Sequence, residues 1–171
     1  MEHDNDIIAN GAIARAHHKL LFADPNLNTF AILDGASIPD LLERLTKENP
    51  EHVCLTAGKL VPELARAAAY LVRLESDDPF TEWILADGWL RHWGIFALSR
   101  RDIRIVRNHL RDLLMVDDPD GRRLYFRYYD PRVLRLYLPT CTDEEKKIVF
   151  GPITEFLCED EREGEMLSFT L

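Results

Sequence analysis

Arginine and tyrosine side chains alternate with apolar ones in the stretch from Arg122 to Thr140. Each guanidinium group carries five N–H donors in a planar fork, a geometry that suits carboxylates and backbone carbonyls. An arginine that is partly buried needs an internal carboxylate as its partner. The stretch therefore predicts either a surface that binds a protein partner or an internal network of ion pairs.

The candidate arginines lie in two segments. A predicted helix from Arg100 to Val116 carries three of them at positions i, i+3 and i+7, beside its buried face. The candidate residues of both segments are Arg104, Arg107, Arg111, Arg123, Arg127, Tyr129, Asp130, Arg132 and Arg135.

Two interpretations of these arginines stay open. In the first, Arg127, Arg132 and Arg135 lie near a strand end and a helix start and present their donors to a partner. In the second, Asp130 or Asp34 pairs with one arginine and joins two secondary-structure elements.

Asp34 is also the candidate for catalysis. It follows an apolar run within Leu33–Gly35, and α/β folds place ligands at strand ends. An Asp-Gly pair is equally typical of a plain turn. A small hydrolytic enzyme that uses Asp34 and a histidine is therefore the alternative function.

Other catalytic and metal-binding patterns are missing. The chain has no GxSxG, P-loop or GxGxxG motif, and its histidines lack the spacing of metal ligands. The aspartates of segment 117–120 lack the glycine and glutamate of a calcium loop. We expect no cofactor and no metal.

Composition limits the class of protein. The 171 residues, 46% of them hydrophobic, predict one domain with one sizeable core. A net charge of -9 argues against nucleic-acid binding, which normally uses a basic face. The segment from Arg91 to Arg135 nevertheless holds 11 Arg, no Lys and 6 Asp, so one basic segment lies within an acidic protein.

Cysteine usage and hydropathy predict the location of the chain. Its three cysteines form no CxxC motif, which predicts reduced thiols. The acidic N-terminus lacks the apolar region of a signal peptide, and no apolar run is long enough to span a membrane. We expect a cytoplasmic protein.

Short apolar runs alternate with amphipathic segments in the first half of the chain, which predicts an α/β domain with a mixed β-sheet flanked by helices. Helices are expected at 13–22, at 37–49 with Ser37 as cap and Pro39 in the first turn, at 59–69, and at 78–93 with Leu90 inward. Strands are expected at 29–36, 52–57, 70–75 and 94–99.

The second half is predicted as a helix, a hairpin and further helices. Asp118–Gly121 has the composition of a turn between strands. Alternation in the second strand places Leu124, Phe126 and Tyr128 toward the core, and Arg123, Tyr125, Arg127 and Tyr129 away from it.

Three local signals then define the elements that follow the hairpin. Asp130 and Pro131 predict a helix start, and Pro139 its end. Thr142 and Glu145 have capping-box spacing at the start of another helix. A hairpin with an acidic tip, either solvated or partner-binding, closes the chain.

Several segments, in this order, resemble the adaptor (effector chaperone) domain of bacterial type VI secretion systems. The similarity covers about residues 29–157, and its most specific part is FRYYDPRVLRLYLP, beside the LDG and HLR segments. The matching segments are 30–45, 68–75, 79–85, 92–99, 106–142 and 150–157.

The resemblance implies a function that the residues alone do not. Such adaptors bind a cognate toxic effector in the producing cell and help to load it on the VgrG spike, without being toxic enzymes themselves. Arg127, Asp130, Arg132 and Arg135 match the family motif. We expect the effector's N-terminal region to contact some of the candidate arginines.

Overall fold

Strand β1 (Asn28–Asp34) lies at the centre of the fold, and its apolar residues are buried on both faces of a sheet. The computed structural model describes residues 2–118, 120–160 and 165–171, with side chains from Gly11 onward. β1 pairs with β3 (Ala69–Leu74) on one side and with β4 (Gly94–Ser99) on the other. Because neither face meets water, these strands are almost continuously apolar.

Within the described residues, the sheet has six strands in the order β2-β3-β1-β4-β7-β8. Its outer strands are β2 (His52–Cys54) at one edge and β7 (Glu155–Glu159) followed by β8 (Met166–Thr170) at the other. Each pairing found in the described part of the chain is antiparallel.

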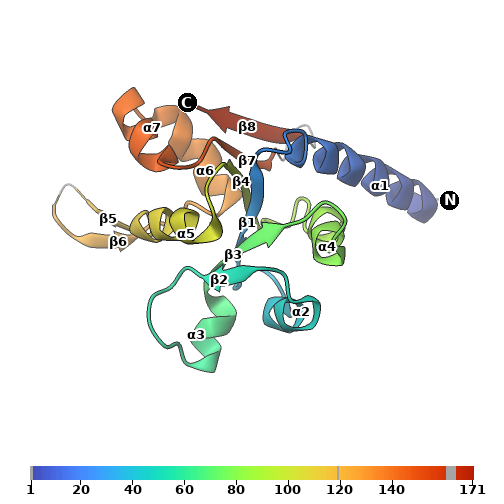
Figure 1. Cartoon of the computed structure of the whole chain (residues 1–171), viewed down its shortest axis with the longest axis horizontal. Helices are drawn as coiled ribbons and strands as arrows, with labels where there is room; N and C mark the ends of the chain where they lie inside the picture. The colour runs from blue at the N-terminus through green and yellow to red at the C-terminus, as the bar shows by residue number, and fades with distance from the viewer. Residues whose placement is uncertain (1, 119, 161–164) are drawn as a thin grey trace.

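Helices cover both faces of the sheet (Figure 1). Helices α5 (Ile103–Asp112), α6 (Pro131–Tyr137) and α7 (Asp143–Phe150) pack with Phe30 and Ile32 on one face. The other face, with Ala31 and Leu33, is covered by α1 (Glu2–Leu21), α2 (Leu41–Glu48) and α4 (Pro79–Asp87). The α/β class, with helices flanking a central sheet, is confirmed, whereas the sheet was expected to be mixed and its described pairings are all antiparallel.

Two elements lie outside these layers. Helix α3 (Pro62–Ala67) has no buried residue, and β5 (Met115–Asp117) pairs with β6 (Arg123–Tyr125) in a separate two-stranded hairpin. Figure 1 shows the hairpin projecting beyond α5, with α3 at the lower end of the molecule. A short 3-10 helix, Leu138–Thr140, follows α6.

Three predicted helix starts are confirmed by side-chain caps. Asp78 accepts the amide of Phe80, and Asp130 accepts the amide of Arg132. Thr142 and Glu145 form the capping box at the start of α7. These caps are short-range patterns, so the sequence predicts them directly.

The predicted cap of α2 is wrong. The helix begins at Leu41, after Asp40, whose backbone is left-handed with φ 61°. Pro39 therefore lies before the helix rather than in its first turn. The Ser37 hydroxyl instead donates to Asp34 Oδ2 at 2.6 Å. The Ser37 hydroxyl thus supplies a donor to a buried carboxylate, which needs hydrogen bonds from the protein, and no described side chain caps the helix.

The predicted faces of the second hairpin strand are confirmed only in part. Phe126 and Tyr128 pack in the core as expected, and the expected exposed positions Arg123, Tyr125 and Arg127 are exposed, but Leu124 and Tyr129 are not on the predicted faces. Strand β6 ends at Tyr125, and its Leu124 is exposed rather than in the core. The chain then turns, so Tyr128 and Tyr129 are both buried although they are neighbours. Alternation between two faces holds only while the backbone stays extended.

Other boundaries differ from the predicted ones. Helix α1 begins at Glu2, α5 ends at Asp112 before β5, and α4 ends at Asp87. Leu90, expected inward, is exposed in the turn after α4 and has a positive φ of 59°. The expected acidic tip includes residues 161–164, which lie outside the described residues.

Candidate partner-binding site

Asp34 at the end of β1 is a buried acceptor for three donors. Its Oδ1 accepts the amide of Ala36 at 3.1 Å, and its Oδ2 accepts the hydroxyl of Ser37 and the guanidinium of Arg127. The Asp34 side chain is only 2% exposed. None of these partners, all of them described residues, is a histidine.

Arg127 connects the segment after β6 to the end of β1. Its Nη2 donates to Asp34, and its guanidinium lies 5.8 Å from the centre of the Tyr129 ring. Burial is the largest influence on the pKa of Arg127 and lowers it, but Asp34, Tyr129 and Asp130 together raise this pKa overall. Arg127 is therefore a fixed cation that joins two elements far apart in the sequence.

Asp130 combines a helix cap with an ion pair. Its Oδ1 accepts the amide of Arg132 at 3.0 Å and the Nε of the same residue at 2.9 Å, while its Oδ2 accepts Nη2 at 2.7 Å. Burial is the largest influence on the pKa of Asp130 and raises it, but the hydrogen bonds and charge of Arg132, together with the charge of Arg127, lower this pKa overall. The carboxylate is thus held in its charged form.

Arg135 and Glu159 connect α6 to the sheet and to the turn after α4. Arg135 Nη1 donates to the backbone carbonyl of Glu159 at 2.8 Å. The buried Glu159 carboxylate accepts the amide of His92 at 3.1 Å and pairs with its ring. These contacts support the interpretation that the motif arginines belong to the scaffold.

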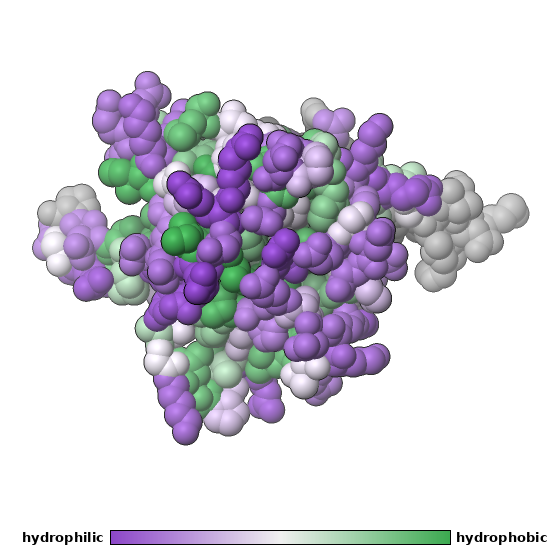
Figure 2. Space-filling model, viewed as in Figure 1, coloured by the Kyte–Doolittle hydropathy of each residue, from purple (hydrophilic) through white to green (hydrophobic). Residues whose placement is uncertain are grey.

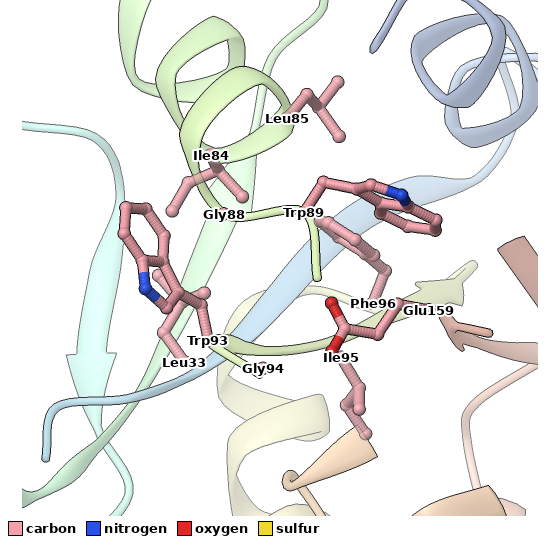
Figure 3. Close-up of a pocket in the computed structure, with 10 residues that line it drawn as sticks. All are labelled: Leu33, Ile84, Leu85, Gly88, Trp89, Trp93, Gly94, Ile95, Phe96 and Glu159. Atoms are coloured by element: carbon pink, nitrogen blue, oxygen red, sulfur yellow. The ribbon is translucent and has the colours of Figure 1, made fainter. Parts of the chain in front are cut away.

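A small apolar cavity of about 20 Å³ lies next to this network. Figure 3 shows the Glu159 carboxylate beside this cavity, which the rings of Trp89 and Trp93 also line. Its volume is close to that of one water molecule, so it is a packing defect of the core rather than a ligand site.

The arginines of α5 and β6 are less constrained. The side chain of Arg104 is 84% exposed and lies 3.7 Å from Asp102, which caps the helix. Arg107 is half-buried, and its Nε has no hydrogen-bond partner among the described residues. Arg111 is half-buried, and Arg123 is exposed on the hairpin.

A crevice of about 310 Å³ lies between α3 and the segment that follows β6. The Asp34–Arg127 pair is part of its lining, so two of the predicted site residues meet a surface that a ligand can reach. The lining residues are Asp34, Ala36, Thr56, Leu60, Leu64, Ala67, Ala68, Tyr125, Arg127 and Tyr129.

Gly35 allows the end of β1 to come close to α3. A Cβ atom at this position would collide with the backbone carbonyl oxygens of Arg66 and Ala68. The Gly35 amide also donates to the Ala68 carbonyl at 3.0 Å. The glycine of the LDG segment thus serves close packing of the β1 end against the backbone of segment 66–68.

The structure brings together only part of the predicted set. Asp34, Arg127 and Tyr129 meet at the crevice, whereas Asp130, Arg132 and Arg135 lie in or beside α6. Sequence reasoning missed Leu60 and Leu64, because segment 59–69 was predicted only as a helix, with no face of it assigned to a surface. The available signal was that Val61 and Leu64 share one side of a helix.

The described residues form neither a group of side chains suited to bind a metal ion nor a helix suited to span a membrane. No group of three or more His, Cys, Asp or Glu side chains in this part of the chain is arranged to hold a metal ion. No described helix is both long enough and apolar enough to cross a membrane.

Comparison with known proteins gives one family match. A model described as "Domain of unknown function (DUF4123)" matches residues 29–147. No curated protein and no solved structure matches the chain. The matched range begins at the residue where the resemblance to secretion adaptors begins and ends ten residues before that resemblance does.

Proposed function

The chain belongs to the DUF4123 family, and from this membership we propose that it is an adaptor of a bacterial type VI secretion system. In this role it binds a cognate toxic effector in the cytoplasm of the producing cell and promotes loading of that effector on the VgrG spike. The observation that carries the proposal is the family match over residues 29–147, the range that includes the motif FRYYDPRVLRLYLP.

The geometry of the site supports a binding protein rather than a catalyst. The buried carboxylate of Asp34 is hydrogen-bonded to Arg127, Ser37 and Ala36, so it acts as a structural anchor in this proposal. The crevice beside it has apolar walls and one accessible guanidinium, a combination typical of protein-binding surfaces.

Binding between purified proteins tests the adaptor function. The chain is titrated calorimetrically against the toxin encoded beside its gene, and separately against the neighbouring VgrG protein. We expect saturable binding of the toxin, and we expect removal of the adaptor gene to abolish recovery of the toxin with VgrG. A toxin encoded beside a different spike gene is the matched control.

Absence of binding to both neighbouring proteins would overturn the proposal. The hydrolytic alternative makes a different prediction, since it requires turnover of a substrate that is lost in a folded Asp34→Asn variant. That result would replace the adaptor function with an enzymatic one.

A further inference from the structure

The two walls of the crevice expose apolar side chains that the fold does not cover. On the α3 wall, Leu64 is 59% exposed and the neighbouring Val61 is 55% exposed. On the opposite wall, Tyr125 is 49% exposed. Figure 2 shows apolar surface gathered at the lower left of the molecule, where Figure 1 places α3.

The projecting hairpin extends one of these walls. Directly opposed residues of an antiparallel pair share one face, and so do residues two apart in a strand. Met115 is opposite Tyr125, and Asp117 is opposite Arg123, so these four side chains share the face that leads into the crevice. All six strand residues are exposed, although a two-stranded hairpin is marginally stable by itself.

The charged residues that line the crevice indicate which chemical class of ligand it can bind. Asp34 and Arg127 are the charged residues among those that line the crevice. The Asp34 side chain is 2% exposed, whereas that of Arg127 is 45% exposed, so a ligand meets the cation. Asp34 receives Arg127 Nη2, and a guanidinium has further N–H donors for a second carboxylate or a carbonyl.

We propose that a short linear segment of the cognate effector binds in this crevice. The segment places an apolar side chain between Leu64 and Tyr125 and a carboxylate on Arg127. This inference rests on the proposed adaptor function and adds to it a surface and a chemical class of ligand. The concave shape and the small volume of about 310 Å³ favour a few side chains of an extended segment over a flat folded surface.

Two substitutions test the crevice without touching the Asp34–Arg127 pair. Leu64→Glu places a negative charge on the apolar wall, and Ala67→Trp fills the crevice from an exposed position of α3. The control is Ile148→Glu, because Ile148 is 67% exposed on α7, which Figure 1 places at the opposite end of the molecule from α3. Circular dichroism first checks that each variant is folded.

The probe is the toxin encoded beside the gene of this chain, titrated calorimetrically. We expect each crevice variant to weaken binding by about tenfold or more, as substitutions at buried interface positions do, and the control to bind like the parent. Overlapping synthetic peptides that cover the same toxin are titrated against the parent protein. We expect one peptide to compete with the toxin and to lose affinity when its carboxylate is changed to an amide.

The outcomes separate the two proposals. If the parent binds neither toxin nor spike, the adaptor function fails and this inference fails with it. If the parent binds the toxin and both crevice variants bind equally well, the adaptor function stands and the crevice is excluded. Loss of VgrG binding alone in these variants, or the failure of every peptide to compete, likewise overturns the crevice as the effector site.

Discussion

The Asp34–Arg127 pair is asymmetric in its exposure, and this decides what each residue contributes. Asp34 is buried, and its charge depends on donors from the protein, whereas water reaches nearly half of the Arg127 side chain. Loss of the arginine therefore leaves a buried carboxylate with two remaining donors, Ala36 and Ser37. Loss of the carboxylate leaves a cation that water can solvate in part.

Arg127→Met should accordingly destabilise the protein more than Asp34→Asn. We expect a loss of about 2–3 kcal/mol for Arg127→Met, below the range for fully buried pairs because the arginine is half-exposed. We expect about 1 kcal/mol for Asp34→Asn, whose amide oxygen still accepts a hydrogen bond. Urea unfolding of the single and double variants measures both losses.

The double variant is the control for this interpretation. With a neutral side chain at position 34, the cost of removing Arg127 should fall by an amount on the order of 1 kcal/mol. Strictly additive losses would show that the two side chains do not interact energetically.

Sequence alone predicts the short-range part of this site. The Asp130 cap follows from an Asp-Pro pair, and its confirmation needs no knowledge of the tertiary fold. The sequence suggested Asp34 as a partner for one of several arginines. That the partner is Arg127 depends on a tertiary contact between residues 93 positions apart, which the sequence pattern does not show. Glu159, which receives Arg135 and His92, was not predicted for the same reason.

At the scale of elements, α1 packs against α4 and the turn that follows it through an aromatic contact. The centroids of the His17 and Trp89 rings are 3.8 Å apart. The His17 Nδ1 atom is buried without a hydrogen-bond partner among the described residues. Burial lowers the pKa of His17 below 6.5 because the charged imidazolium loses solvation. The helix is therefore bound best when His17 is neutral.

Stability should fall when the pH drops below the ordinary histidine pKa. In the unfolded chain His17 takes up a proton at its ordinary pKa of about 6.5, whereas in the folded protein it does so only at a lower pH. The contribution of neutral His17 to the free energy of unfolding is therefore fully present above pH 6.5. It is lost as the pH falls toward the lower pKa of the folded state. His17→Phe keeps a ring against Trp89 without a titratable group. We expect its free energy of unfolding to change less than that of the parent between about pH 7.5 and about pH 5.

The two proteins share every other titrating group, so the difference between their pH profiles isolates His17. Urea unfolding at each pH measures it. Parallel profiles would contradict the role of neutral His17 in holding α1.

Element type was predictable where hydrophobic periodicity extends over many residues, as in β1 and α5. Strand direction was not predictable, because helical connections of this length permit both parallel and antiparallel neighbours. The prediction for the second hairpin strand was wrong at Tyr129 because Tyr128 and Tyr129 lie in a turn, which a period-2 pattern cannot represent. Segment 59–69 was predicted as a helix, but only the fold shows that α3 lies at the margin of the molecule with no buried residue.

At the scale of the whole molecule, β7 contributes side chains to the cores on both faces of the sheet. One of these cores lies under α6 and α7, and the other lies under the helices of the opposite face. Phe156 and Cys158 belong to the core under α5, α6 and α7, whereas Leu157 belongs to the core under α1, α2 and α4. All three side chains are fully buried. Both cores therefore need a strand that lies beyond the family match at residues 29–147.

A chain that ends after Thr154 should consequently fail to form the native fold. It lacks β7 and β8, so β4 becomes an open edge. The buried Glu159 carboxylate is missing, and so are the three fully buried side chains of Phe156, Leu157 and Cys158. Each of these three losses costs about 2–5 kcal/mol, and together they match or exceed the total stability of a typical domain, about 5–15 kcal/mol. Near-ultraviolet circular dichroism should show no fixed aromatic environment, whereas a control chain that lacks only the exposed Leu171 should retain the parent spectrum. Cooperative unfolding of the shortened chain would show that residues up to Thr154 suffice as a folding unit, and that the C-terminal hairpin only covers a sheet already able to form without it.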